Sequence, residues 1–159
     1  MQVLVMYYSR TGNTKKLAEA VADGVRGVEE IECIVKTPDD VVSEDFLNSH
    51  AIIAGSPVYF GSMAAELKLV FDKFVKVRPK MENKIGAAFA TSAGASGGKE
   101  TTIISILQAM LINGMIIVGD PLDAGGHYGV SCVDSPDAVT IENAKKMGRR
   151  VAELTLKLG

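Results

Sequence analysis

A short run of small polar residues near the start of the chain has the composition of an anion-binding loop. It reads Ser9-Arg10-Thr11-Gly12-Asn13-Thr14. The run lies between apolar residues 3–8 and a helical pattern over residues 14–26. The first N–H groups of a helix lack partners and carry partial positive charge, and hydroxyl and amide side chains add further donors. The arrangement predicts a phosphate site; the alternative is a helix start that Thr11 or Asn13 simply caps, with no ligand.

The elements that would position this loop follow from the hydrophobic pattern. Apolar runs rich in Val, Ile and Ala, as expected of strands covered on both faces, occur at residues 2–8, 31–35, 51–55, 85–90 and 115–118. Helical patterns alternate with them at residues 14–26, 43–48, 63–74, 103–111 and 137–158. Strict alternation predicts an α/β fold, a doubly wound parallel sheet with helices on both faces. No linker or repeat interrupts it, so we expect one domain over residues 1–159.

Three further loops follow later strands, at residues 55–63, 91–99 and 125–129. Ligands of open α/β sheets bind beyond the carboxyl ends of the strands. Glycines let the backbone approach a ligand, and Tyr59, Phe60 and Tyr128 offer rings for stacking on a planar heterocycle. The first loop lacks both G-x-G-x-x-G and the P-loop pattern. A mononucleotide with a large ring therefore fits better than a dinucleotide.

Residues 7–21, Tyr-x-Ser-x-x-Gly-x-Thr-x-x-x-Ala-x-x-Val, resemble the flavodoxin phosphate-loop signature, with Met6 before it a small departure. A narrower resemblance is to the FMN-dependent NAD(P)H:quinone oxidoreductases related to tryptophan repressor-binding protein A. It is carried by residues 55–63 with Leu67 and 71–73, and by residues 91–103, 113–115 and 126–129. The resemblance implies a flavodoxin-like three-layer sandwich with five strands in the order 2-1-3-4-5. It also implies FMN as cofactor, NADH or NADPH as electron donor and a quinone or similar acceptor.

The resemblance further implies which residues form the site. Ser9 to Thr14 would bind the phosphate, Pro57 to Gly61 would line one side of the flavin ring, and Thr91 to Gly97 would hold its pyrimidine edge. The expected cofactor-binding residues are Ser9, Arg10, Thr11, Gly12, Asn13, Thr14, Pro57, Val58, Tyr59, Phe60, Gly61, Thr91, Ser92, Ala93, Gly94, Ala95, Gly97 and Tyr128.

Two residues are candidate catalytic groups. His127 could donate a hydrogen bond to a quinone oxygen if it lies over the flavin; otherwise it is a solvated side chain. Asn113 stands where this branch often has His, and its alternative role is a helix C-cap shared with Gly114. Residues 37–50, 75–84 and 119–125 are shorter than in the typical quinone reductase, in which these insertions shape the substrate pocket and the tetramer. We expect a homodimer or homotetramer.

Composition excludes several classes of protein. The net charge is −2 without a basic stripe, so we expect no nucleic-acid partner. Cys33 and Cys132 are the only cysteines. They predict no metal site and cannot supply the roughly four thiolates of an iron–sulfur cluster. Two isolated cysteines suit a protein of a reducing compartment. No apolar stretch approaches the roughly 20 residues of a membrane span, and no leader is recognisable, so we expect a cytoplasmic protein.

Two other functions share this topology. A phospho-acceptor receiver domain needs acidic residues at the end of the first strand, where this chain has Tyr7, Tyr8 and Ser9, so that function is excluded. A flavodoxin-type electron carrier without its own substrate stays open as the alternative. Such carriers are typically more acidic and often stack a Trp on the flavin, whereas this chain has a net charge of −2 and no Trp.

Overall fold

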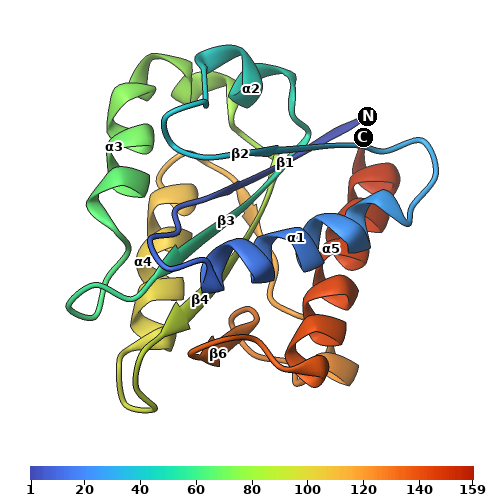
Figure 1. Ribbon diagram of the computed structural model, residues 1–159. Coiled ribbons are helices and arrows are strands. Elements are labelled where there is room, and N and C mark those ends of the chain that lie inside the picture. The colour runs from blue at the N-terminus through green and yellow to red at the C-terminus, as the bar shows by residue number, and fades with distance from the viewer.

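A parallel sheet runs through the centre of the computed structural model, which describes residues 1–159 (Figure 1). Its strands are β1 (Gln2–Tyr7), β2 (Glu32–Lys36), β3 (Ala51–Pro57), β4 (Ile85–Ser92), β5 (Ile116–Ile117) and β6 (Ser131–Val133). The hydrogen-bonded order is β2-β1-β3-β4-β5, and β6 also pairs with β4. The predicted parallel sheet and its strand order 2-1-3-4-5 are confirmed.

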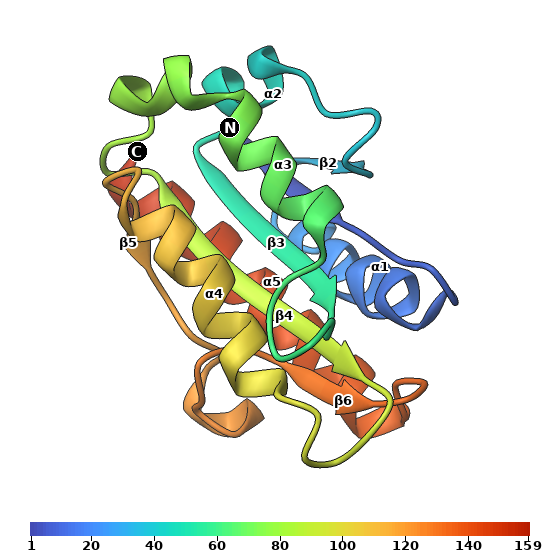
Figure 2. The same cartoon turned by 90° about the vertical axis from the view of Figure 1, so that its left-hand side faces the viewer.

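Helices cover both faces of the sheet. They are α1 (Asn13–Arg26), α2 (Ser43–Asn48), α3 (Ala65–Lys73), α4 (Lys99–Leu111) and α5 (Ala138–Leu158), with 3₁₀ turns η1 (Val75–Lys80) and η2 (Leu122–Ala124). Helices α1 and α5 lie together on one face, and α3 and α4 lie on the other, where Figure 2 shows them in front of β3 and β4. The result is the expected three-layer arrangement with a separate apolar core on each side of the sheet.

Glycines set the distance between α1 and α5. A Cβ added at Gly24 would lie 2.0 Å from the Lys145 carbonyl oxygen, and one at Gly148 would lie 2.0 Å from the Val21 carbonyl oxygen. The two helix backbones therefore touch where they cross. This close contact fixes α1, and with it the loop that precedes α1, against the rest of the molecule.

The fifth strand differs from the prediction, because it is split into two short pieces. Ile116 pairs with Ile85 near the start of β4, and Ser131 pairs with Ala90 near its end. Residues 118–130 leave the sheet between the two pieces, and the Arg150 guanidinium holds this excursion by donating to the carbonyls of residues 119 and 120. The hydrophobic pattern predicts residues 125–129 after the fifth strand, whereas in the structure they interrupt it.

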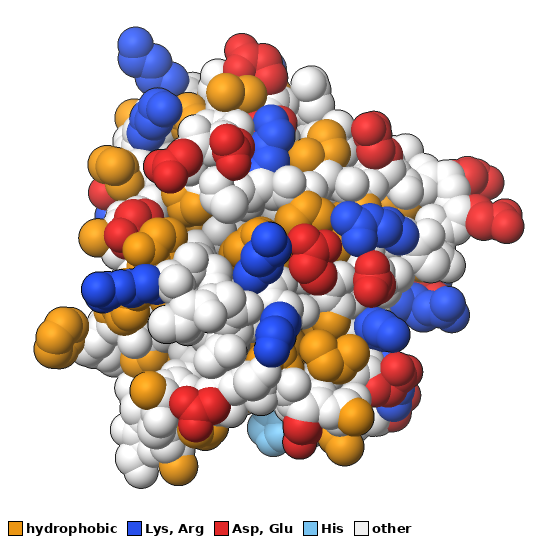
Figure 3. Space-filling model, in the orientation of Figure 1, with side chains coloured by type: hydrophobic (Ala, Val, Ile, Leu, Met, Phe, Trp, Pro, Cys, Tyr) orange, Lys and Arg blue, Asp and Glu red, His pale blue; other side chains and the backbone are white.

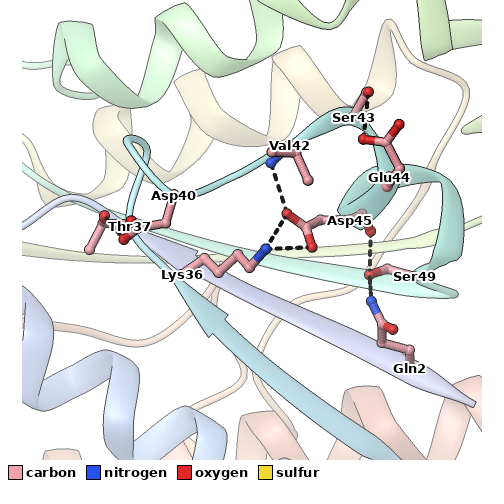
Figure 4. A network of polar contacts seen from close by, with 9 residues as sticks. All are labelled: Gln2, Lys36, Thr37, Asp40, Val42, Ser43, Glu44, Asp45 and Ser49. Atoms are coloured by element: carbon pink, nitrogen blue, oxygen red, sulfur yellow. Dashed lines mark hydrogen bonds and ion pairs between the residues drawn. The ribbon is translucent and has the colours of Figure 1, made fainter.

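An ion pair fixes the segment between β2 and α2 (Figure 4). The Lys36 ammonium donates to both carboxylate oxygens of Asp45, at 2.8 and 2.7 Å. The same carboxylate accepts the N–H of Val42, which is the reach-back half of a capping box at the start of α2. Asp45 is buried, so this polar set anchors the outer edge of the sheet rather than contributing an open site. No helix has the combined length and apolar character needed to cross a membrane.

Candidate functional site

The loop between β1 and α1 turns through a glycine. Gly12 has φ +95° and ψ −12°, a left-handed conformation that favours glycine, and it is the N-cap residue of α1. The N-cap residue Gly12 has no side chain, and neither Thr11 nor Asn13 caps the helix, so the alternative in which one of them caps it is wrong. The Ser9 hydroxyl oxygen instead accepts the N–H groups of Gly12 and Lys15, each at 3.2 Å, and shapes the loop from within.

Several backbone donors of this loop stay free. The N–H groups of Arg10, Thr11, Asn13 and Thr14 donate to no other atom of the chain. They lie at or just before the first turn of α1, where the helix dipole adds partial positive charge. Unpaired amides at a helix N-terminus form a binding site for an anion such as phosphate. The residues present therefore fit a phosphate group.

The side chain of Thr14 faces the opposite way. Its hydroxyl lies 2.8 Å from the hydroxyl of Thr91 at the end of β4, and both residues are buried. This hydrogen bond joins the first loop to the strand that carries the third loop. In this structure Thr14 offers its backbone N–H, rather than its hydroxyl, to a ligand.

The second loop, after β3, ends in a tight hairpin. Tyr59 and Ser62 exchange two backbone hydrogen bonds, at 3.0 and 3.1 Å. Phe60 and Gly61 form the turn with φ of 52° and 79°, and the Phe60 side chain is fully exposed. A Phe in the left-handed region is strained, and such strain is characteristic of ligand-contacting loops. Below the turn, the partly buried Pro57 and Val58 rest on β4, since the Val58 N–H donates to the Thr91 carbonyl.

The third loop, after β4, is exposed from Ala93 to Gly97. It folds on itself, because the Ser92 hydroxyl and the Gly97 N–H both donate to the Gly94 carbonyl. The following Gly98 has φ +95°, and a Cβ there would lie 3.1 Å from the Cα of Gly61. The second and third loops therefore touch, and the structure brings together all three loops that we expect to hold the cofactor. Ala95 belongs to the exposed part of this loop.

A residue that the sequence analysis did not single out completes this edge of the sheet. The Glu66 carboxylate, beside the Tyr8 hydroxyl, raises the pKa of Tyr8, and desolvation adds to the shift. The Tyr8 ring packs edge-on against Tyr59, with centroids 6.2 Å apart. Glu66 lies in the first turn of α3, where the helix dipole is enough to explain a carboxylate. The sequence alone therefore gave no sign that Glu66 lies beside Tyr8.

His127 and Tyr128 lie in the excursion between β5 and β6. They border a cavity of about 290 Å³ together with Lys99 and Glu100, the first residues of α4. The buried Asp120 carboxylate accepts the backbone N–H of His127 at 2.7 Å, while the imidazole Nδ1 lies 3.9 Å from that carboxylate and is largely exposed. The excursion thus holds both residues beside the third loop, separate from the first.

Asn113 lies at the other end of the sheet. Its side-chain amide donates to the Ala109 carbonyl at 2.6 Å, and Gly114 follows with φ +77°, which is the geometry of a helix C-cap. At 1.5 Å per residue, the 13 residues of α4 separate Asn113 from the third loop by about 20 Å. The structure therefore does not bring Asn113 to the loops within one chain. No group of three or more His, Cys, Asp or Glu side chains is arranged to hold a metal ion.

Comparison with known proteins agrees with this geometry. Residues 1–127 match the family described as NADPH-dependent FMN reductase. The chain belongs to this family. An NAD(P)H dehydrogenase (quinone) of Archaeoglobus fulgidus is 36% identical over 188 aligned positions, covering 99% of this chain and 98% of the relative. A flavodoxin of Aquifex aeolicus is 35% identical, covering 96% of this chain and 85% of the relative.

The fold of this family member also has solved counterparts. The crystal structure of a flavodoxin, WrbA-like protein from Agrobacterium tumefaciens superposes with a TM-score of 0.86 over 99% of both chains, at 23% identity. The predicted flavodoxin-like fold and the resemblance to the quinone oxidoreductase branch are confirmed. The alignment with the archaeal dehydrogenase is longer than this chain of 159 residues, so that relative carries stretches that this chain lacks.

Proposed function

We propose that the chain is an FMN-dependent NAD(P)H oxidoreductase that passes two electrons to a quinone or similar acceptor. The observation that carries the proposal is the set of four unpaired N–H groups at the start of α1, those of Arg10, Thr11, Asn13 and Thr14. Family membership and the quinone-dehydrogenase relative support the same reading. The whole chain, residues 1–159, then forms a single FMN-binding domain.

The residues of the three loops divide the work of holding the cofactor. The amides of Arg10, Thr11, Asn13 and Thr14 and the Ser9 hydroxyl bind the phosphate. Residues 57–61 line one side of the ring system, and residues 91–97 bind its polar edge, with residues 93–97 offering exposed backbone. Bound FMN supplies the two-electron chemistry between nicotinamide and acceptor. Overall, NAD(P)H and one proton convert the quinone to the hydroquinone and leave NAD(P)⁺.

The chain's own groups position the reactants. Tyr8 and Tyr59 form an edge-on aromatic pair behind the second loop, and Glu66 raises the pKa of the Tyr8 hydroxyl further above neutral pH. The exposed Arg10 guanidinium has no carboxylate partner and favours anionic or carbonyl oxygen at the mouth of the site. His127 remains our candidate for donating a hydrogen bond to the acceptor, from its place beside the third loop.

The assembly and location are also proposals. Leu122, Tyr128 and Val139 expose large apolar surfaces on the excursion and at the start of α5, which supports association into a homodimer or homotetramer through that region. Cys33 and Cys132 are free thiols, which supports a cytoplasmic location.

A flavodoxin-type electron carrier is the second candidate, favoured by the flavodoxin relative. Anaerobic mixing of the FMN-loaded protein with NADH, and separately with NADPH, distinguishes the two. The enzyme predicts rapid bleaching of the flavin absorbance, followed by recovery when benzoquinone is added. No bleaching by either nucleotide, with full bleaching by dithionite, would establish the carrier.

A pair of variants tests the site itself. Ser9→Ala removes the acceptor that shapes the first loop and one donor to the phosphate, and it should weaken FMN binding about 10-fold to 100-fold. Ser43→Ala, in α2 far from the three loops, is the control and should leave FMN affinity unchanged. Equal affinities in both variants would contradict the assignment of the phosphate to this loop.

A further inference from the structure

A long groove between α3 and α4 is not explained by cofactor binding. It has a volume of about 1390 Å³, whereas three other cavities of the molecule have volumes of about 290, 260 and 290 Å³. One end opens at Arg10, Tyr59 and Phe60, which belong to the candidate site. The groove then follows α4 from Ser105 to Ile112, which at 1.5 Å per residue gives a length of about 12 Å. It is therefore continuous with the place where the acceptor must arrive.

The surface of the groove is more apolar than polar. Met63 and Phe71 are almost completely buried beneath it, while Val75 and Ile112 form exposed walls farther along. Ala109 provides a small residue on the α4 side and keeps the groove open. In the space-filling view, hydrophobic side chains gather along the left margin, over α3 and the loop that precedes it (Figure 3).

Three of the five charged side chains that line the groove have partners, whereas Arg10 and Glu66, both near the mouth, form no ion pair. The Lys68 ammonium is paired with the Asp72 carboxylate at 2.6 Å. The Arg78 side chain donates to the Ile112 carbonyl at 2.7 Å and so bridges η1 to the end of α4 at the far end of the groove. At the near end, the Met63 N–H donates to the Ser105 hydroxyl at 3.1 Å and ties the two sides together. The groove thus has a polar mouth, and hydrogen bonds join its two sides at both ends.

We propose that this groove binds the apolar side chain of a lipophilic quinone, with the quinone ring at the mouth beside Arg10 and Tyr59. The inference rests on the proposed function, and it names the substrate class as quinones that carry an isoprenoid or comparable hydrocarbon tail. A nicotinamide dinucleotide suits the slot poorly, because a diphosphate would lie against apolar walls beyond the mouth. The tail makes no covalent change; it only increases the time that the ring spends at the site.

The test uses the FMN-loaded protein and quinones that share one ring but carry no tail, one isoprene unit or two. A methylene fully removed from water increases binding by a factor of about four, so a partly covered isoprene unit should raise kcat/KM at least about tenfold. The benefit should level off once the tail exceeds the length of the groove. Equal kcat/KM with and without a tail would overturn the inference and leave the proposed function standing.

Variants separate groove binding from general lipophilicity. In Ala109→Trp the indole fills the groove, and the ratio of kcat/KM between tailed and tailless quinones should fall toward one. Val75→Glu places a carboxylate on an exposed wall without a packing demand and should lower the same ratio. Leu111→Trp, on the same helix but outside the groove, is the matched control and should keep the wild-type ratio.

Two other results would overturn the inference. If size-exclusion chromatography shows that Ala109→Trp and Val75→Glu dissociate an oligomer, the groove is an interface between copies of the chain. If the ratio is unchanged in both variants, the tail binds elsewhere. Failure to reduce even the tailless quinone would refute the proposed function and this inference with it.

Discussion

The hydrogen bond between the Thr14 and Thr91 hydroxyls joins the first loop to β4, and its contribution to the free energy of unfolding can be measured. Thr14→Val keeps the side-chain shape but leaves the Thr91 hydroxyl, 4% exposed, without its partner. A buried hydroxyl that loses its partner costs about 1–3 kcal/mol of unfolding free energy. For a chain of this size, each kcal/mol lowers Tm by about 2–4 °C. Thr91→Val should cost a similar amount for the same reason.

The double variant makes the test specific. When both hydroxyls are replaced, no polar group is left unsatisfied, so the combined cost should be smaller than the sum of the two single costs by about 1–2 kcal/mol. Urea denaturation of the flavin-free proteins measures this, because ligand affinity then does not contribute. Strictly additive costs would show that the two hydroxyls are not bonded to each other. The structural link between the first and third loops would then be refuted.

Three further predictions concern packing, pH and the strained loop. Gly24→Ala should destabilise the chain by at least about 2 kcal/mol despite the better helix propensity of Ala, because the added Cβ would clash with the Lys145 carbonyl. Gly27→Ala at the helix end is the control and should be nearly neutral in thermal denaturation. The Asp137 carboxylate caps α5 by accepting the Thr140 N–H, and this hydrogen bond lowers the pKa of Asp137. The stability that the cap provides is therefore present above the ordinary carboxyl pKa of 3.8 and is lost as the pH falls below that value. The Tm difference between wild type and Asp137→Ala should therefore shrink as pH falls through that range, and a constant difference would count against it. Phe60→Asn should raise Tm, because Asn tolerates the left-handed turn, while lowering kcat/KM for quinones; a loss of Tm would contradict the strain assigned to Phe60.

The sequence allowed the sheet and the first loop to be predicted because their signals are local. Strands such as β3 are continuous apolar runs, and the phosphate loop is a contiguous string of small polar residues. The division of the fifth strand could not be predicted in the same way. β6 has only three residues, and what places it in the sheet is pairing with β4 about 40 positions earlier in the chain.

Long-range side-chain contacts could not be predicted from the sequence either. The Thr14 hydroxyl belongs to the polar run that predicts the phosphate donors, but in the structure it bonds to Thr91 at the end of β4. The place of Glu66 beside Tyr8 depends on how α3 returns across the sheet edge. The C-cap role of Asn113 could be predicted from the sequence, because Gly114 follows it. Its distance from the three loops depends on the length and direction of α4, which the structure shows.

The most direct test of the account compares FMN with riboflavin, which lacks only the phosphate. Flavin-free protein is titrated with each, and the quenching of flavin fluorescence gives stoichiometry and Kd. If two of the free amides at the start of α1 donate to charged phosphate oxygens, the affinity for FMN should exceed that for riboflavin by about 10²-fold to 10⁴-fold. We predict one FMN per chain, bound tighter than riboflavin by at least the lower of these factors. Equal affinity for the two flavins, or no binding of FMN, would contradict the central claim that this loop holds the phosphate of the cofactor.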